Sequence, residues 1–249
     1  MVSLEVCANS ATSAIAAQNG GAARVELCNN LYQGGITPSH GHILVARKHL
    51  HIKLYTLIRP RSGDFLYTKE EFQVMLSDVR QSIALGCDGI VVGILNKDGS
   101  VDMERNSQIV NMARQHGLGV TFHRAFDVCA DKEKALEDLI HIGFERLLTS
   151  GGKSNVIEGA RNVKNLLDQA NGRISIMPGG GISEKNVADL VHYTGVKEIH
   201  SSARALVNSG MEYRNDSIMM GSRYVDEYAI YETSSKIVQN LIRLANSGD

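Results

Sequence analysis

Two short stretches near the start of the sequence carry the same pair of chemically active residues. Glu5-Val6-Cys7 and Glu26-Leu27-Cys28 each place a carboxylate shortly before a thiol. Because side chains alternate along a strand, the Glu and the Cys of each stretch share one face. A thiolate can be a metal ligand, and an enclosed carboxylate can act as a general acid or base. The stretches therefore indicate a metal site, a catalytic site, or two strands whose cysteines are simply small buried side chains.

Charged residues also follow apolar runs further along the chain. The run ending in IRPRSGDF supplies Arg59 and Arg61, and TFHRAFD supplies His123 and Asp127. In TFHRAFD the phenylalanines alternate with His123, so the rings are expected to face a core of helices while His123 faces the opposite side. Buried charges are costly unless they are paired, which makes such a collection a functional site or a structural ion-pair cluster. The candidate catalytic residues are Glu5, Glu26, Arg59, His123, Asp127 and His200.

Small residues follow the last three apolar runs, in the motifs TSGG, MPGGG and EIHSSAR. Glycine lets backbone N–H groups approach a ligand closely, and loops in this part of a barrel often bind phosphate. The same glycines could also serve tight turns alone. The expected anion-binding residues are Arg61, Gly151, Gly152, Gly180, Gly181, Ser201 and Ser202.

These candidates lie within a recurring unit of helix end, glycine, short spacer, apolar run and polar tip. Examples are AQNGGAARVELCN, IALGCDGIVVGIL and HYTGVKEIHSSA. The glycine fits the position just past a helix, where a positive φ is needed. The apolar, β-branched run that follows is typical of a buried parallel strand. Strands are predicted to begin near Ser3, Arg24, Lys53, Gly89, Gly119, Arg146, Ile174 and Glu198.

Helical spacing fills the gaps between the predicted strands. Thr68 and Glu71 form a capping box that opens an amphipathic helix through Leu85. Thr37 followed by Pro38 predicts a second helix start, with Thr37 as the N-cap. Further helices are predicted over residues 132–142, 156–169, 184–192 and 233–245.

Eight strand and helix units in 249 residues predict a single (β/α)8 TIM barrel spanning residues 1–249. The rival is a doubly wound sheet, which usually carries a glycine-rich turn after its first strand, and no glycine follows Cys7 directly here. Sites in such barrels form at the C-terminal ends of the strands, where the candidate residues fall. A long connection at about 206–232 leaves this rim before the last helix. It is placed to close over the site, where Arg214 could join the anion-binding residues.

The composition excludes several classes of partner. The formal net charge is −1, there is no Trp, and aromatic residues make up 5% of the chain, so neither a basic surface nor a base-stacking platform for nucleic acid is expected. No apolar run reaches membrane-spanning length, and the start of the sequence does not resemble a signal peptide, so we expect a cytoplasmic protein without a membrane partner. The four cysteines are expected to be thiols.

The motifs EVC, RVELC, PSHG, IRPRSGDFLYT, TFHRAFD, LLTSGG, MPGGGI, EIHSSAR and MEYRN together resemble the CutC family of copper homeostasis proteins. They run from residue 4 to residue 215, which covers most of the chain. One departure is Ser62, where the family usually has Gly. The resemblance implies a TIM barrel, a cytoplasmic protein that is often a homodimer, and a role in copper handling. It also implies that Cys7 and Cys28 are the copper ligands.

Two functions remain open from the sequence. The first is Cu(I) binding through inward-facing Cys7 and Cys28 at the C-terminal rim, since two thiolates from neighbouring strands suit this ion. The alternative is an enzyme of unknown reaction that acts on an anionic or phosphorylated small molecule. In that case Arg59 would hold the anion, while Glu26 or His123 would act as general acid or base. Copper binding requires the cysteines, whereas catalysis requires the arginine, the histidine and the glutamates.

Overall fold

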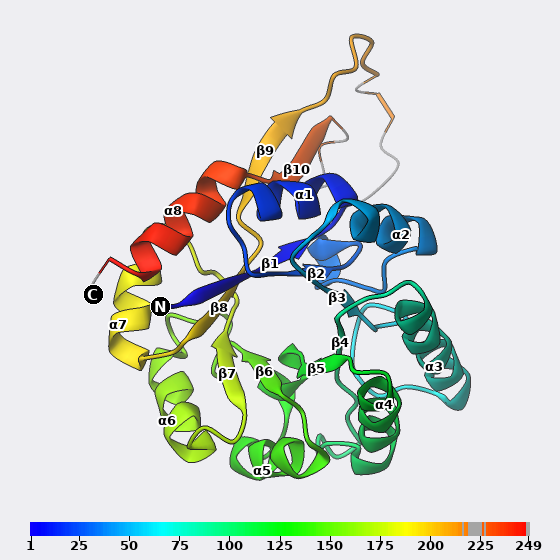
Figure 1. The fold of residues 1–249 in the computed structure, drawn as a ribbon, viewed down its shortest axis with the longest axis vertical. Helices are drawn as coiled ribbons and strands as arrows, with labels where there is room; N and C mark the ends of the chain where they lie inside the picture. The colour runs from blue at the N-terminus through cyan, green and yellow to red at the C-terminus, as the bar shows by residue number, and fades with distance from the viewer. Residues whose placement is uncertain (216, 219–225, 227, 248–249) are drawn as a thin grey trace.

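A computed structural model describes residues 1–215, 217–218, 226 and 228–247. Within these residues a sheet of eight parallel strands has the order β7-β6-β5-β4-β3-β2-β1-β8, and β7 and β8 lie side by side to complete a barrel (Figure 1). The (β/α)8 barrel predicted from the sequence is therefore confirmed. Its strands are β1 (Ser3–Ala8), β2 (Arg24–Leu27), β3 (Lys53–Leu57), β4 (Gly89–Val92), β5 (Gly119–Phe122), β6 (Arg146–Thr149), β7 (Ser175–Pro178) and β8 (Glu198–Ser201).

A ring of helices surrounds the strands (Figure 1). Strand residues that point outward, such as Val6, Leu27 and Phe122, are fully buried against this ring, so the main apolar core lies between sheet and helices. The helices are α1 (Ala11–Asn19), α2 (His40–His49), α3 (Lys69–Ala84), α4 (Met103–Gln115), α5 (Lys132–Ile142), α6 (Ala160–Ala170), α7 (Val187–Thr194) and α8 (Ser235–Ala245), with short 3-10 helices η1 (Leu31–Gln33) and η2 (Arg124–Val128).

A helix starts where the sequence predicts when a local cap sets its boundary. It starts elsewhere when a contact with a distant segment sets the boundary. The capping box of Thr68 and Glu71 is present at the start of α3. The start predicted at Thr37 is wrong, because Ser39 caps α2 instead. Thr37 is tied to the end of β3: its N–H donates to the carbonyl of Arg59, and its hydroxyl accepts from the N–H of Arg59 at 2.9 Å.

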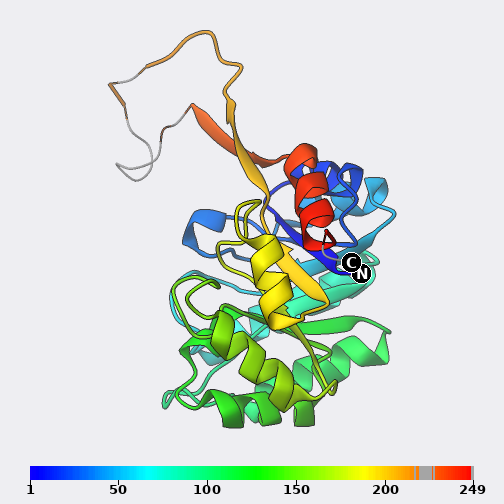
Figure 2. The same cartoon turned by 90° about the vertical axis from the view of Figure 1, so that its left-hand side faces the viewer.

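Three other helices begin later than predicted, among them α8, which begins at Ser235 rather than residue 233, and the segment before α8 contains strands. Residues 156–159 form turns before α6, where the N–H of Val156 donates to the carbonyl of Gly180 at 2.8 Å. In α7 the first helical residue is Val187 rather than residue 184. Between β8 and α8 the chain forms an antiparallel pair, β9 (Arg204–Asn208) and β10 (Ala229–Thr233). This pair projects beyond the ring of helices (Figure 2).

No helix among the described residues is long and apolar enough to cross a membrane.

Candidate functional site

A cavity of about 590 Å³ opens at the C-terminal rim of the barrel. Its floor includes Cys7, Glu26 and His200, from β1, β2 and β8. One wall includes Arg59 and His123, which follow β3 and β5. The structure thus brings together residues that lie far apart in the sequence, at the rim where barrel sites form.

Two thiols meet at the floor of the cavity. The sulfur atoms of Cys7 and Cys28 lie 3.5 Å apart, and both cysteines are buried and free of disulfides. Cys7 lines the cavity, while Cys28 lies behind it with its thiol 3.6 Å from the carbonyl oxygen of Ala8. The strand register explains the contact: Cys7 lies opposite Glu26 in the sheet, so Cys28 is the next inward-facing residue above that pair.

A carboxylate and an imidazole lie beside the thiols. Cys7, Glu26 and His200 each offer one donor atom, and these atoms all lie within 4.8 Å of one another. With Cys28 added, the cluster contains two sulfur donors, one oxygen and one nitrogen. This donor set can fit a soft ion through its sulfur atoms.

His200 is held between two acidic groups. Its Nδ1 lies 2.8 Å from Glu5 and its Nε2 lies 3.6 Å from Glu26, so both ring nitrogens face carboxylates. Burial alone would lower the pKa of His200, but hydrogen bonds to Cys7 and Glu5 and the charge of Glu26 outweigh it and raise the pKa well above 6.5. The pKa of the Cys7 thiol is also raised, by its hydrogen bond with Cys28 and by burial.

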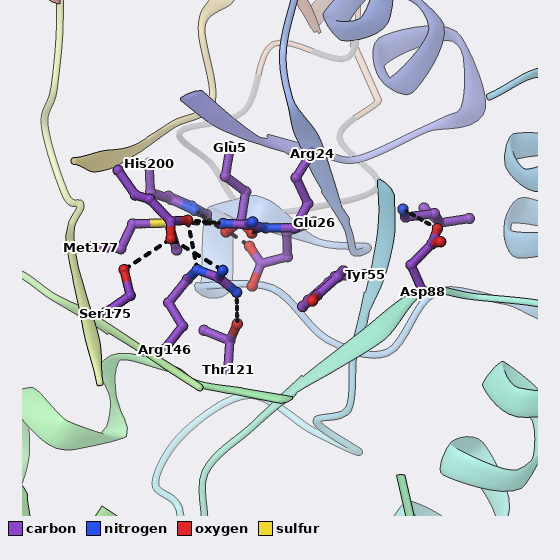
Figure 3. A network of polar contacts seen from close by, with 12 residues as sticks. Glu5, Arg24, Glu26, Tyr55, Asp88, Thr121, Arg146, Ser175, Met177 and His200 are labelled. Carbon is purple, nitrogen blue, oxygen red and sulfur yellow. Dashed lines mark hydrogen bonds and ion pairs between the residues drawn. The ribbon is translucent and has the colours of Figure 1, made fainter. Parts of the chain in front are cut away.

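Glu5 belongs to an ion-pair layer that lies beneath the cavity. Figure 3 shows the polar contacts of this layer. Glu5 pairs with the guanidinium of Arg24, which also lies 2.5 Å from Glu198. Glu198 in turn pairs with Arg146 at 2.7 Å. Burial raises the pKa of Glu5, but the charge of Arg24 and the hydrogen bond from His200 outweigh it and hold the pKa at about 2. Glu5 is therefore an ionised residue whose charge is neutralised inside the barrel.

An aromatic ring lies against both arginines of this layer. The guanidinium carbons of Arg24 and Arg146 lie 5.1 and 5.8 Å from the ring centroid of Tyr55, and the Tyr55 hydroxyl donates to Glu145 at 2.6 Å. Arg24, Arg146 and Tyr55 are not among the site residues predicted from the sequence. A signal was available for Arg24, because it lies two residues before Glu26 on a strand and so shares its inward face.

Asp127 occupies the turn after β6, where Gly151 and Gly152 were expected to bind an anion. Its carboxylate accepts from the N–H groups of Ser150 and Gly152 at 3.0 Å, and from the hydroxyl of Thr149 at 2.5 Å. The N–H of Gly151 donates to the Thr149 hydroxyl. The glycine turn after β6 thus binds an anion supplied by the protein itself, and neither Gly151 nor Gly152 lines the cavity.

The two arginines that follow β3 have different surroundings. The guanidinium of Arg59 lines the cavity and donates to the carbonyls of Gln33, Gly35 and Gly63 at 3.1, 2.8 and 2.7 Å. Arg61 lies outside the cavity lining and pairs with Glu71 at 2.5 Å, so the structure does not bring it to the site.

His123 lies on the same wall, with 5% of its surface exposed. The N–H of Ala125 donates to its Nδ1 at 3.2 Å, and this contact caps η2. Burial and then the charge of Arg59 lower the pKa of His123 to about 3. This histidine is therefore neutral at ordinary pH, and so low a pKa makes its ring a weak base, which does not support its predicted role as a general base.

The remaining predicted anion-binding residues line the opposite side of the cavity. Gly180 and Gly181 have φ values of 96° and 91°, which an L side chain rarely adopts, and both reach the cavity. Ser201 donates to the carbonyl of Ile182 at 3.0 Å, while Ser202 accepts from Arg204 at 3.2 Å. Beyond the cavity lining, the guanidinium of Arg214 lies 4.9 Å from the ring centroid of Tyr228, so the expected closure by Arg214 is not seen.

Comparison with known proteins identifies relatives along most of the chain. The sequence model of the CutC family matches residues 2–205. A CutC family protein from Chromobacterium violaceum is 49% identical over 238 residues, which cover 96% of each chain. The "Copper homeostasis protein cutC homolog" of Mus musculus is 45% identical over 97% of this chain and 89% of its own. A crystal structure of CutC from Streptococcus agalactiae superimposes with a TM-score of 0.77, at 37% identity, over 81% of this chain and 99% of that one.

Proposed function

Since this chain belongs to the CutC copper homeostasis family, we propose that it binds Cu(I) through the thiols of Cys7 and Cys28 at the floor of the rim cavity. The observation that carries the proposal is the 3.5 Å separation of the two sulfur atoms inside the barrel. Two thiolates are sufficient for Cu(I), which is soft and accepts few ligands. When bound, the ion would be carried as cargo or stored, and no reaction is proposed for it.

The surroundings of the thiols favour a sulfur-only site. Zinc usually takes about four donors. The nitrogen donors near the thiols belong to His200, and both already face carboxylates: Nδ1 lies 2.8 Å from Glu5 and Nε2 lies 3.6 Å from Glu26. Two thiolates with one Cu(I) carry a net negative charge. A protonated His200 beside Cys7 would balance that charge without being a ligand.

Competitive titration tests the proposal. Metal-free, reduced protein is titrated with Cu(I) against a chromophoric chelator such as bicinchoninate. Replacing Cys7 and Cys28 together with Ser is expected to weaken Cu(I) affinity by at least about 100-fold. The matched control replaces Cys87 and Cys129 with Ser, because these thiols are also buried but lie outside the cavity lining.

The control pair is expected to keep wild-type affinity. If the variant lacking Cys7 and Cys28 binds Cu(I) as tightly as the wild type does, the assignment of ligands is wrong. If the control pair loses affinity equally, the ion binds elsewhere. Circular dichroism of each variant shows whether the barrel has folded.

A further inference from the structure

One wall of the cavity contains an N–H donor with no partner. Nε2 of His123 is buried, and no hydrogen-bond acceptor among the described residues faces it. The other ring nitrogen fixes its protonation, because Nδ1 accepts the N–H of Ala125 at 3.2 Å and must carry a lone pair there. The proton of the neutral ring therefore resides on Nε2. A buried donor left without an acceptor is costly, so its retention needs a reason.

A buried positive charge lies on the same wall. Arg59 is 5% exposed, and its three hydrogen bonds go to neutral backbone carbonyls. Among the residues that the structure describes, no carboxylate forms an ion pair with it. A buried charge is normally compensated by an opposite one. The backbone carbonyls position the guanidinium but leave its charge unbalanced.

One aromatic ring joins these two groups. The ring centroid of Phe65 lies 5.0 Å from the guanidinium carbon of Arg59 and 5.0 Å from the ring centroid of His123. All three residues line the cavity, together with the apolar side chains of Leu31 and Leu57. The wall thus combines an unpartnered donor, a positive charge and apolar surface, which is the composition of a site for a small organic anion.

We propose that this wall binds the carboxylate of a small organic acid, with one carboxylate oxygen accepting the Nε2 proton of His123 and its charge balancing that of Arg59. The proposal concerns binding, names no reaction, and is independent of copper. It assigns His123 as a neutral donor instead of a base.

The cavity favours a carboxylate over a phosphate ester. A single negative charge matches Arg59, which is the one buried arginine among the lining residues, whereas a phosphate dianion would meet the carboxylates of Glu26 and Asp127, which line the same cavity. The backbone N–H groups of Ser150 and Gly152, which could hold a phosphate, already donate to Asp127.

Nuclear magnetic resonance of metal-free protein labelled with 15N-histidine tests the donor directly. Long-range 1H–15N spectra distinguish the two neutral tautomers and the imidazolium. We expect His123 to carry its proton on Nε2, and we expect acetate, pyruvate or benzoate to shift that resonance. Acetamide and inorganic phosphate serve as probes without a carboxylate, and each is expected to bind at least about tenfold more weakly.

Two variants of His123 distinguish its role as an N–H donor from its role in capping η2. His123→Asn keeps a side-chain acceptor that can cap η2 but removes the distal N–H, and it is expected to weaken carboxylate binding at least about tenfold. His123→Gln places an amide N–H near the position of Nε2 and is expected to retain most of the affinity. Cu(I) affinity of His123→Asn should equal that of the wild type.

The proposal is overturned by any of four results. These are a proton on Nδ1, no binding of any carboxylate probe, phosphate binding more tightly than the carboxylates, or unchanged carboxylate binding by His123→Asn.

Discussion

The strands β1 and β2 carry the same Glu-x-Cys pattern, yet the two copies have different surroundings. In the sheet Glu5 lies opposite Arg24 and Cys7 lies opposite Glu26, so the second copy is displaced two residues toward the rim. Glu5 consequently falls in the ion-pair layer, against Arg24 and His200. Glu26 falls one level higher and lines the cavity.

The difference shows how barrel stagger can divide one motif into two roles. Neighbouring strands of a barrel are offset along its axis, so equal sequences do not reach equal depth. The pKa of Glu5 is lowered by its partners, whereas burial is the largest cause that raises the pKa of Glu26. One carboxylate stabilises the barrel interior, and the other remains available at the floor of the cavity.

The largest expected effect is on stability, and it tests whether Glu5 and Glu26 have different roles. Glu5→Gln leaves Arg24 without its carboxylate partner in the barrel interior and is expected to lower the free energy of unfolding by about 3–5 kcal/mol. The matched variant Glu26→Gln is expected to change it by no more than about 1 kcal/mol. Urea unfolding followed by circular dichroism gives both values. Equal losses in the two variants would contradict the division of roles.

The pH dependence of stability should also distinguish Glu5 from Glu26. The pKa of Glu5 is about 2 in the folded protein against an ordinary 4.5, so its ionised form contributes about 3 kcal/mol at neutral pH. A lowered folded pKa means that this contribution is complete above about pH 4.5 and is lost as the pH falls toward 2. The stability difference between wild type and Glu5→Gln should therefore shrink across that range in urea titrations. A difference that stays constant would show that Glu5 is not the group involved.

Metal selectivity provides a smaller and sharper test. Glu26→Gln is expected to leave Cu(I) affinity within about threefold, because a carboxylate is a hard ligand that Cu(I) does not favour. The same change should weaken any Zn²⁺ binding by about tenfold, since zinc uses oxygen donors. Competition titrations with each ion measure both effects. A large loss of Cu(I) affinity would mean that the oxygen is a ligand and that the sulfur-only description is wrong.

The smallest expected effect concerns the two thiols. Cys7 is 6% exposed and lines the cavity, whereas Cys28 is fully buried behind it. Iodoacetamide should therefore modify Cys7 faster than Cys28, and slowly in absolute terms because the raised pKa of Cys7 keeps its thiol protonated. Peptide mass spectrometry over a time course gives the two rates. Faster modification of Cys28 would contradict the conclusion that Cys28 lies deeper than Cys7.

Local patterns were enough to predict the strands and their inward faces. Each apolar run could be recognised from its own residues, and alternation placed Glu5, Cys7, Glu26 and Cys28 on one side. The cap at Thr68 was equally local. These features depend on neighbours a few residues apart, which a single sequence records directly.

The rest of the site depends on contacts between distant segments. The register of β1 against β2 decides which glutamate meets Arg24, and no local pattern encodes the barrel stagger. The pairing of Arg24 with Glu198 joins residues from β2 and β8. The sequence indicated donors after β6, but only the folded chain shows that Asp127 already accepts from them.

Asp127 also has a consequence for selectivity. Because it is tethered to the same chain, it competes for the N–H groups of Ser150 and Gly152 at an effective concentration of about millimolar or higher. A free phosphorylated metabolite at similar concentration would have to displace a competitor that cannot diffuse away. The N–H groups of this turn are in this sense already occupied by an anion of the same chain.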